Sequence, residues 1–173
     1  MRAIVVYESH WGNTAAIARA IAKGLGPDAR AVTTAEASAE NLAGVQLIVA
    51  GAPLLGFSLP TEEMLHNLSG ERSPTPPDLS HPSMRSWLDL LAAGCGAAAA
   101  FETRIWWSPG SSAKAILHKL EELGYPALAK PQRFVVDGKY GPLRAGEVER
   151  AEAWGAELAA SYAATHNAMQ YND

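Results

Sequence analysis

Cysteine, long apolar runs and clusters of basic residues are scarce or missing in this chain of 173 residues. The single cysteine, Cys95, cannot form an intrachain disulfide, which fits a reducing compartment and indicates the cytoplasm. No run approaches the roughly 20 apolar residues of a transmembrane helix. Lysine and arginine form no run and the net charge is −4, which argues against a nucleic-acid partner. We therefore expect a cytoplasmic protein that binds neither membranes nor nucleic acid.

Metal-ligand spacing and hydrolytic motifs are also missing. The five histidines are scattered, and no two of them stand at the spacing of metal ligands, so we expect no metal site. No Ser-His-Asp ordering or paired carboxylate arrangement stands out. The first residues have no signal-peptide layout, because a polar loop follows a short apolar run at once. Cys95 precedes an apolar run, and we interpret it as an inert packing residue.

Apolar residues make up 48% of the chain, enough for one domain with a sizeable core. We assign that domain to residues 1–164 and leave residues 165–173 as a C-terminal tail without an interpretation. Five short apolar runs predict strands, at Ala3–Tyr7, Arg30–Thr34, Gln46–Gly51, Ala97–Phe101 and Arg133–Asp137.

Helical patterns alternate with most of these runs. They are predicted at Thr14–Lys23, near Ala39–Leu42, from Ser83 to Gly94, from Ser111 or Ser112 to Gly124, and over about Ala145–Ala164. Trp87 and Trp154 lie inside such patterns, and we interpret both as packing residues. Glu71–Ser83 contains four prolines and few apolar residues, which predicts a surface loop.

Strands and helices that alternate in this way predict a doubly wound α/β fold, with a parallel sheet and helices on both faces. Ligands of such sheets bind beyond the carboxyl ends of the strands. Function is therefore expected in three loops at those ends, Ser9–Thr14, Ala52–Leu59 and Glu102–Ser111.

The loop after the first strand has the character of an anion site. Backbone N–H groups at a helix start are unpaired and lie at the positive end of the helix dipole. Ser9, Asn13 and Thr14 add side-chain donors, and Gly12 allows a close backbone approach. The loop is neither a P-loop nor a dinucleotide fingerprint, and it has no lysine. This pattern suits a monophosphate that stays bound.

Ser9-His10-Trp11-Gly12-Asn13-Thr14 resembles the phosphate loop of flavodoxins, which reads roughly T/S-x-T-G-N-T. Four of its five specified positions match, and Trp11 stands where a small hydroxyl residue is usual. With the five strands and their loops, the chain resembles a short-chain flavodoxin. The resemblance implies a five-stranded sheet of order 2-1-3-4-5 and FMN bound noncovalently.

The resemblance also implies which residues bind FMN. The phosphate would lie on the loop that holds Ser9, His10, Trp11, Gly12, Asn13 and Thr14. One face of the flavin ring would be covered by the loop that holds Pro53, Leu54, Leu55, Gly56 and Phe57. Within it, Gly56 would be the residue whose peptide can flip, so that its carbonyl accepts a hydrogen bond from the flavin.

The other ring face would be covered by a loop after the fourth strand, which holds Glu102, Thr103, Arg104, Trp106 and Trp107. Adjacent residues of an extended chain point to opposite sides, so only one of the two tryptophans would stack on the ring. Glu102 would lower the reduction potential. Arg104 would raise it, meet an anionic partner, or form a salt bridge with an acidic neighbour.

These residues lead to one expected function and two alternatives. The first is an electron carrier between redox partner proteins, in which FMN does the chemistry and no side chain is catalytic. The second is an FMN-dependent reductase of quinones or similar small acceptors that uses NAD(P)H. The third is a flavodoxin-like module that has lost FMN and acts in binding or regulation, for which Trp11 is a supporting feature.

Overall fold

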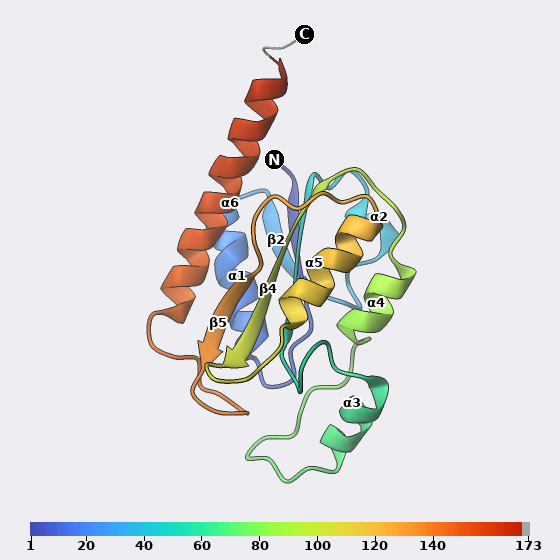
Figure 1. Ribbon diagram of the computed structural model, residues 1–173, viewed down its shortest axis with the longest axis vertical. Coiled ribbons are helices and arrows are strands. Elements are labelled where there is room, and N and C mark those ends of the chain that lie inside the picture. The colour runs from blue at the N-terminus through green and yellow to red at the C-terminus, as the bar shows by residue number, and fades with distance from the viewer. Residues whose placement is uncertain (171–173) are drawn as a thin grey trace.

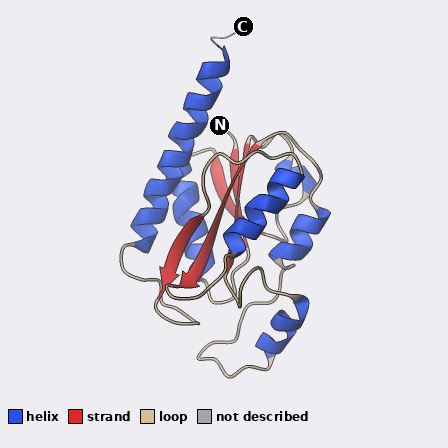
Figure 2. Ribbon diagram, viewed as in Figure 1, coloured by secondary structure: helices blue, strands red, loops and turns tan. Residues whose placement is uncertain are grey.

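The computed structural model describes residues 1–170, and it describes side chains as far as residue 165. The elements in chain order are β1 (Ala3–Tyr7), α1 (Asn13–Leu25), β2 (Ala29–Thr33), α2 (Ala39–Leu42), β3 (Leu47–Pro53), α3 (Glu62–Ser69), α4 (Met84–Leu90), β4 (Ala97–Ile105), α5 (Ser112–Glu122), β5 (Gln132–Val136) and α6 (Glu147–Gln170). The strands form a single sheet with helices on both faces (Figures 1 and 2).

The sheet has the strand order β2-β1-β3-β4-β5, and every neighbouring pair is parallel. This confirms the predicted fold class and strand order. All five strands therefore end at one edge, below the arrowheads of β4 and β5 in Figure 1. The loops after β1, β3 and β4 meet at this carboxyl edge.

Alternate residues of β1 enter two separate cores. Ala3, Val5 and Tyr7 pack with α1 and α6, whereas Ile4 and Val6 pack with α4 and α5 on the other face. Because a strand has a side-chain period of two, an unbroken apolar run lies buried on both faces. Trp154 belongs to the first core and Trp87 to the second, as predicted.

Helices α1 and α6 pack closely through two glycines. A Cβ on Gly24 would lie 1.9 Å from the Glu152 carbonyl oxygen, and one on Gly155 would lie 2.3 Å from the Ile21 carbonyl oxygen. α6 is longer than its predicted span, because it runs unbroken past position 164 to Gln170. Of the expected tail, residues 171–173 lie outside the described part of the chain.

Strand β4 also extends beyond its predicted end at Phe101. Glu102, Thr103 and Arg104 belong to the strand and pair with Arg133, Phe134 and Val135 of β5. The apolar pattern stops at Phe101, so the sequence predicted a loop from Glu102. The strand continues because the charged groups of Glu102 and Arg104 neutralise each other.

The region between β3 and α4 differs in part from the prediction. Helix α3 was missed because only Leu65 and Leu68 of its eight residues are buried, which leaves little apolar periodicity. Segment 71–83 contains no helix or strand, as predicted. Cys95 is exposed, so its interpretation as a packing residue is wrong. Within residues 1–170, none of the helices has both the length and the apolar content needed to cross a bilayer.

Candidate functional site: the loop before α1

The start of α1 differs from the starts of four other helices. Ser38, Thr61, Ser83 and Ser111 cap α2, α3, α4 and α5, and each side chain accepts a backbone N–H. The N-cap of α1 is Gly12, which has φ +84° and makes no side-chain cap. A residue with a Cβ adopts this φ only at a cost, whereas glycine does not. The first N–H groups of α1 are thus left to face the carboxyl edge of the sheet.

The polar side chains of this loop already have partners in the protein. Ser9 Oγ accepts the Ala15 N–H at 3.2 Å, and the hydroxyls of Thr14 and Thr103 are 2.8 Å apart. Asn13 Nδ2 donates to the Tyr140 carbonyl at 3.2 Å. The loop is therefore held in a defined shape, and backbone N–H groups are its main donors for an anion.

A hollow of about 60 Å³ lies beside the loop. Its lining includes Ser9, His10, Trp11, Asn13, Thr14, Pro53, Leu54, Leu55, Thr103 and Arg104, all named from the sequence. Ile105, which belongs to the predicted loop Glu102–Ser111, also lines the hollow. Val136 and Lys139 complete the lining and were not predicted. The fold thus brings residues from the loops after β1 and β3 and from the end of β4 to one place.

Glu102 does not line this hollow, and its predicted place in a loop over the flavin is wrong. Its side chain is fully buried beneath the start of α5, where one carboxylate oxygen accepts the Ala113 N–H at 2.9 Å and the Ser111 hydroxyl at 2.7 Å. Arg104 Nη1 donates to the other oxygen at 2.9 Å. Of the roles considered for Arg104, the structure shows the salt bridge.

Three large aromatic side chains project from neighbouring loops at the carboxyl edge. Phe57 is 74% exposed, Trp106 68% and Trp107 64%. The Ser111 N–H donates to the Phe57 carbonyl at 3.1 Å, which ties the loop after β3 to the loop after β4. Gly56, with φ +72°, precedes Phe57. No core packing explains these exposed side chains, which leaves them free to contact another molecule.

Segment 71–83 lies against the loop before α1. Trp11 Nε1 donates to the Thr75 carbonyl at 3.1 Å, and its ring meets the Tyr140 ring edge to face, with centroids 5.0 Å apart. Glu71 accepts hydrogen bonds from Lys139 and Tyr140, which lowers the pKa of Glu71. Segment 71–83 and the loop after β5 therefore both contact Trp11, which links them beside the loop before α1.

His10 is the residue of this loop whose pKa is shifted from its usual value. Its Nε2 lies 3.2 Å from Glu8 Oε1, and both side chains are almost fully buried. Burial by itself lowers the pKa of His10, but hydrogen bonds to Glu8 and the Asp78 carbonyl raise it by more, so the pKa lies above its usual value of 6.5. A positive charge next to the loop would favour a bound anion.

The sequence analysis missed Glu8, Val136 and Lys139. Glu8 was missed because it stands between the apolar run Ala3–Tyr7 and the loop Ser9–Thr14 and belongs to neither pattern. Val136 and Lys139 lie at and just after the end of β5. The rule that ligands bind beyond the carboxyl ends of strands applies to this strand as well, and it would have included them.

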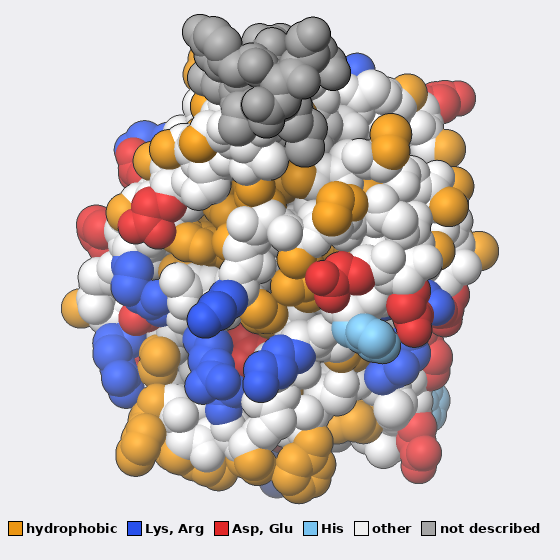
Figure 3. Space-filling view, turned by 45° about the horizontal axis from the view of Figure 1, so that its top comes forward, with side chains coloured by type: hydrophobic (Ala, Val, Ile, Leu, Met, Phe, Trp, Pro, Cys, Tyr) orange, Lys and Arg blue, Asp and Glu red, His pale blue; other side chains and the backbone are white. Residues whose placement is uncertain are grey.

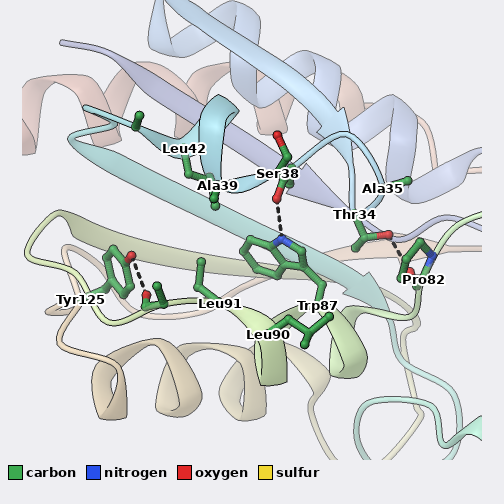
Figure 4. Close-up of a pocket in the computed structure, with 13 residues that line it drawn as sticks. Thr34, Ala35, Ser38, Ala39, Leu42, Pro82, Trp87, Leu90, Leu91 and Tyr125 are labelled. Carbon is green, nitrogen blue, oxygen red and sulfur yellow. Dashed lines mark hydrogen bonds between the residues drawn. The ribbon is translucent and has the colours of Figure 1, made fainter.

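A second cavity, of about 430 Å³, lies between α2 and α4 (Figure 4). Its walls are mainly apolar, with Trp87, Leu91 and Tyr125 among them. The polar groups around it are already bonded within the protein: Trp87 Nε1 donates to the Ala37 carbonyl, and the Tyr125 hydroxyl donates to the Ala92 carbonyl. None of the site residues named from the sequence lines this cavity.

Metal binding and surface charge complete the description. Among the described residues, no three His, Cys, Asp or Glu side chains come together in a way that could hold a metal ion. Figure 3 shows lysine and arginine side chains gathered on one face, with hydrophobic side chains along its lower border. This face is locally basic although the chain has a net charge of −4.

Comparisons with known proteins give structural matches only. No family model and no curated protein matches the sequence. A flavodoxin from the domain Archaea is 20% identical with a TM-score of 0.64, and the alignment covers 94% of this chain and 99% of that one. Flavodoxin 1 from Bacillus cereus is 17% identical with a TM-score of 0.63, covering 91% and 97%.

The same architecture also matches part of a longer chain. The Flv1 flavodiiron core from Synechocystis is 19% identical with a TM-score of 0.59, and the match covers 94% of this chain but 36% of that one. Identities this low show the fold and nothing further. With the parallel sheet of order 2-1-3-4-5, these matches show that the chain has the flavodoxin-like fold.

Proposed function

We propose that this protein binds FMN at the loop before α1 and carries electrons between partner proteins. The observation that carries the proposal is the glycine-capped start of α1, which leaves N–H groups open at the carboxyl edge of a flavodoxin-like sheet. Bound FMN would supply the redox chemistry, and the protein would supply binding, shielding and tuning.

The residues fit the phosphate end of FMN in three ways. The N–H groups of Asn13 and Thr14 at the start of α1 would bind the anion, with the helix dipole favouring its charge. Gly12 supplies the left-handed turn that exposes these groups. The raised pKa of His10 favours an imidazolium that balances the charge of Glu8, so this carboxylate beside the loop would not repel the phosphate.

The ring of FMN would lie outside the small hollow, along the exposed loops. Leu55 and Gly56 would cover one of its faces, and either Trp106 or Trp107 the other. Partner proteins would dock on these aromatics, where exposed apolar side chains are available for contact. Such docking is commonly weak and steered by charge, and the basic face in Figure 3 favours an acidic partner.

The visible spectrum of the purified protein, titrated with FMN and with riboflavin, tests the proposal. If the phosphate lies at the start of α1, FMN binds at least tenfold more tightly than riboflavin, and inorganic phosphate competes with FMN. Equal affinity for the two flavins would place the phosphate elsewhere. A protein that takes up neither flavin would refute the proposal and favour a binding or regulatory module without FMN.

The module without FMN has one supporting observation. The hollow of about 60 Å³ is small beside the roughly 300–1,000 Å³ of common ligand pockets. FMN binding therefore requires that the ring rest on the surface loops or that these loops open. The titration above separates the two functions directly.

A reductase that uses NAD(P)H has a different supporting observation. A recess of about 650 Å³ lies beside the predicted flavin site, between α3 and the loop after β3, and Leu55, Gly56, Met64 and Lys139 line it. This volume would admit a small acceptor next to the flavin. Steady-state oxidation of NAD(P)H by the FMN-loaded protein, with a quinone and without a partner reductase, would identify such an enzyme. No turnover favours the carrier.

The proposal includes a reducing compartment such as the cytoplasm. Cys95 is a free thiol and is exposed at the surface. Exposed thiols persist unpaired in reducing surroundings and oxidise readily elsewhere.

A further inference from the structure

Glu8 is a buried carboxylate that sequence reasoning did not assign. It follows β1 and is 1% exposed. One of its oxygens accepts the Met84 N–H at 2.8 Å, at the start of α4. Its other oxygen, Oε1, lies 3.2 Å from His10 Nε2, and in the described part of the chain neither of these two buried atoms has a further hydrogen-bond partner. A charge this deeply buried is stable only beside a group of opposite charge or a further hydrogen-bond donor.

His10 lies between two acceptors. Its Nε2 is 3.2 Å from Glu8 Oε1, and its Nδ1 is 3.1 Å from the Asp78 carbonyl oxygen. A neutral imidazole has one N–H, so it can donate to only one of them, whereas the imidazolium donates to both. The geometry therefore favours a protonated ring.

The nearby groups Glu62, Arg104 and Lys139 are already neutralised or bonded, and two histidines lie further from the pair. On the side of α3, Glu62 accepts from the hydroxyls of Ser83 and Ser86. On the side of the hollow, Arg104 pairs with Glu102, and Lys139 pairs with Glu71. His66 lines the cavity of about 450 Å³ that Glu8 and His10 also border, and His81 Nε2 lies 3.9 Å from the Asp78 carboxylate. Glu8 is the carboxylate in direct contact with the His10 ring.

His10 also connects two segments that are far apart in the sequence. The Asp78 N–H donates to the His10 carbonyl at 2.8 Å, so His10 holds Asp78 through both its backbone and its ring. We propose that Glu8 and His10 form a buried ion pair at neutral pH, which clasps segment 71–83 onto the loop before α1. The clasp requires no ligand, and it stands whether or not the protein binds FMN.

The clasp should open as the pH rises through the raised pKa of His10. Because the folded state raises the pKa of His10 above 6.5, the stabilisation is complete below 6.5 and is lost as the pH rises through the raised value. Deprotonation leaves either the Glu8 carboxylate or the Asp78 carbonyl without its donor. Segment 71–83 then keeps the bond from the Asp78 N–H to the His10 carbonyl but is held less firmly by the ring, and the cover over the loop before α1 loosens.

A ¹⁵N NMR titration of the His10 ring in the unmodified protein is the primary test, with His10→Gln used to assign the signal. The expected result at pH 7 is a ring protonated on both nitrogens. A neutral ring, whether or not Glu8 holds the proton, would overturn the proposal. This measurement needs no variant to fold and no flavin to bind.

Glu8→Gln and Glu62→Gln provide the matched comparison. Removing the charge of Glu8 should lower the His10 pKa by at least one unit, whereas Glu62→Gln, in the same cavity but without a bond to His10, should leave it unchanged. Hydrogen exchange in segment 71–83 should be at least tenfold faster in Glu8→Gln at pH 6, and in the unmodified protein only above the raised pKa of His10. Equal exchange in both proteins at pH 6 would contradict the clasp.

Discussion

The N-termini of α1 and α5 lie at the same edge of the sheet, on opposite faces. They differ in whether a carboxylate of the protein accepts hydrogen bonds from their first N–H groups. At the start of α5, the Glu102 carboxylate accepts hydrogen bonds from the Ala113 N–H and from the hydroxyls of Ser111 and Ser112. The start of α1 has a glycine cap and no carboxylate of its own. Ser9 takes only the Ala15 N–H.

The comparison teaches where a parallel sheet can accept an anion. Both helices offer a positive dipole end. At α5 the N–H groups at that end already have an acceptor within the protein, the carboxylate of the buried Glu102–Arg104 ion pair. A ligand would therefore find no free donor there. At α1 the same groups face outward, with His10 beside them. We therefore propose that open N–H groups, rather than the helix start as such, suit the start of α1 to binding an anion.

Removing the Glu102 carboxylate from the start of α5 should have the largest effect on the free energy of unfolding. Glu102→Ala leaves Arg104 buried without its partner and frees the first turn of α5, which should reduce the free energy of unfolding by about 3–5 kcal/mol. Chemical denaturation measures this loss. Glu121→Ala, on the exposed side of the same helix, is the control and should change stability by less than about 0.5 kcal/mol. A loss below about 1 kcal/mol for Glu102→Ala would contradict the comparison.

Substituting the two glycines at the ends of α1 should separate binding from stability. Gly12 and Gly26 both have positive φ, and a Cβ on either would meet no atom within 4 Å. Gly12→Ala should therefore lose about 1–2 kcal/mol of stability from left-handed backbone strain alone. Gly26→Ala should lose about 1–3 kcal/mol, because φ 113° and ψ −177° lie in a region that almost only glycine adopts. Only Gly12→Ala should also weaken FMN binding, by about tenfold. Equal FMN affinity in the two variants, measured by fluorescence titration, would show that α1 does not hold the phosphate.

The paired hydroxyls of Thr14 and Thr103 allow a finer test of the same site. Either alanine variant breaks the 2.8 Å bond between them, so both should lose about 1 kcal/mol of stability. Thr14→Ala should weaken FMN binding about five- to tenfold, because it also removes the hydroxyl that the sequence analysis assigned to the phosphate. If Thr103→Ala weakens FMN binding as much as Thr14→Ala, the Thr14 hydroxyl is structural and not a ligand.

The smallest effect is expected at the cap of α5. Ser111 Oγ accepts the Lys114 N–H at 3.1 Å and donates to Glu102 at 2.7 Å. Ser111→Ala removes both bonds, while Glu102 still accepts the Ala113 N–H. The expected loss is roughly 0.5–1 kcal/mol, below that of Glu102→Ala. Thermal unfolding of the single and double variants would show whether the two contributions add. A larger loss for Ser111→Ala than for Glu102→Ala would mean that the hydroxyl, and not the carboxylate, stabilises this helix start.

Local patterns identified the loop before α1 but not the extension of β4 beyond Phe101, which lies beside it. The apolar run at Ala3–Tyr7, Gly12 and the amphipathic helix that follows are features of neighbouring residues, and they placed the loop correctly. Glu102 and Arg104 seemed to end a strand because charge normally marks a surface. Their burial depends on each other and on the start of α5, and no local pattern records that arrangement.

The sequence by itself determined the alternation of strands and helices and the glycine that begins α1, because period-two and helical patterns act over a few residues. The sheet order followed from the resemblance to flavodoxins and not from these patterns. Tertiary structure decided which charges are buried and what covers the loop before α1. Glu8 meets Met84, and His10 meets Asp78, across 76 and 68 positions of the chain. Such partners depend on how the whole chain packs, since a buried charge is stable only where the fold brings its counterpart within hydrogen-bond distance.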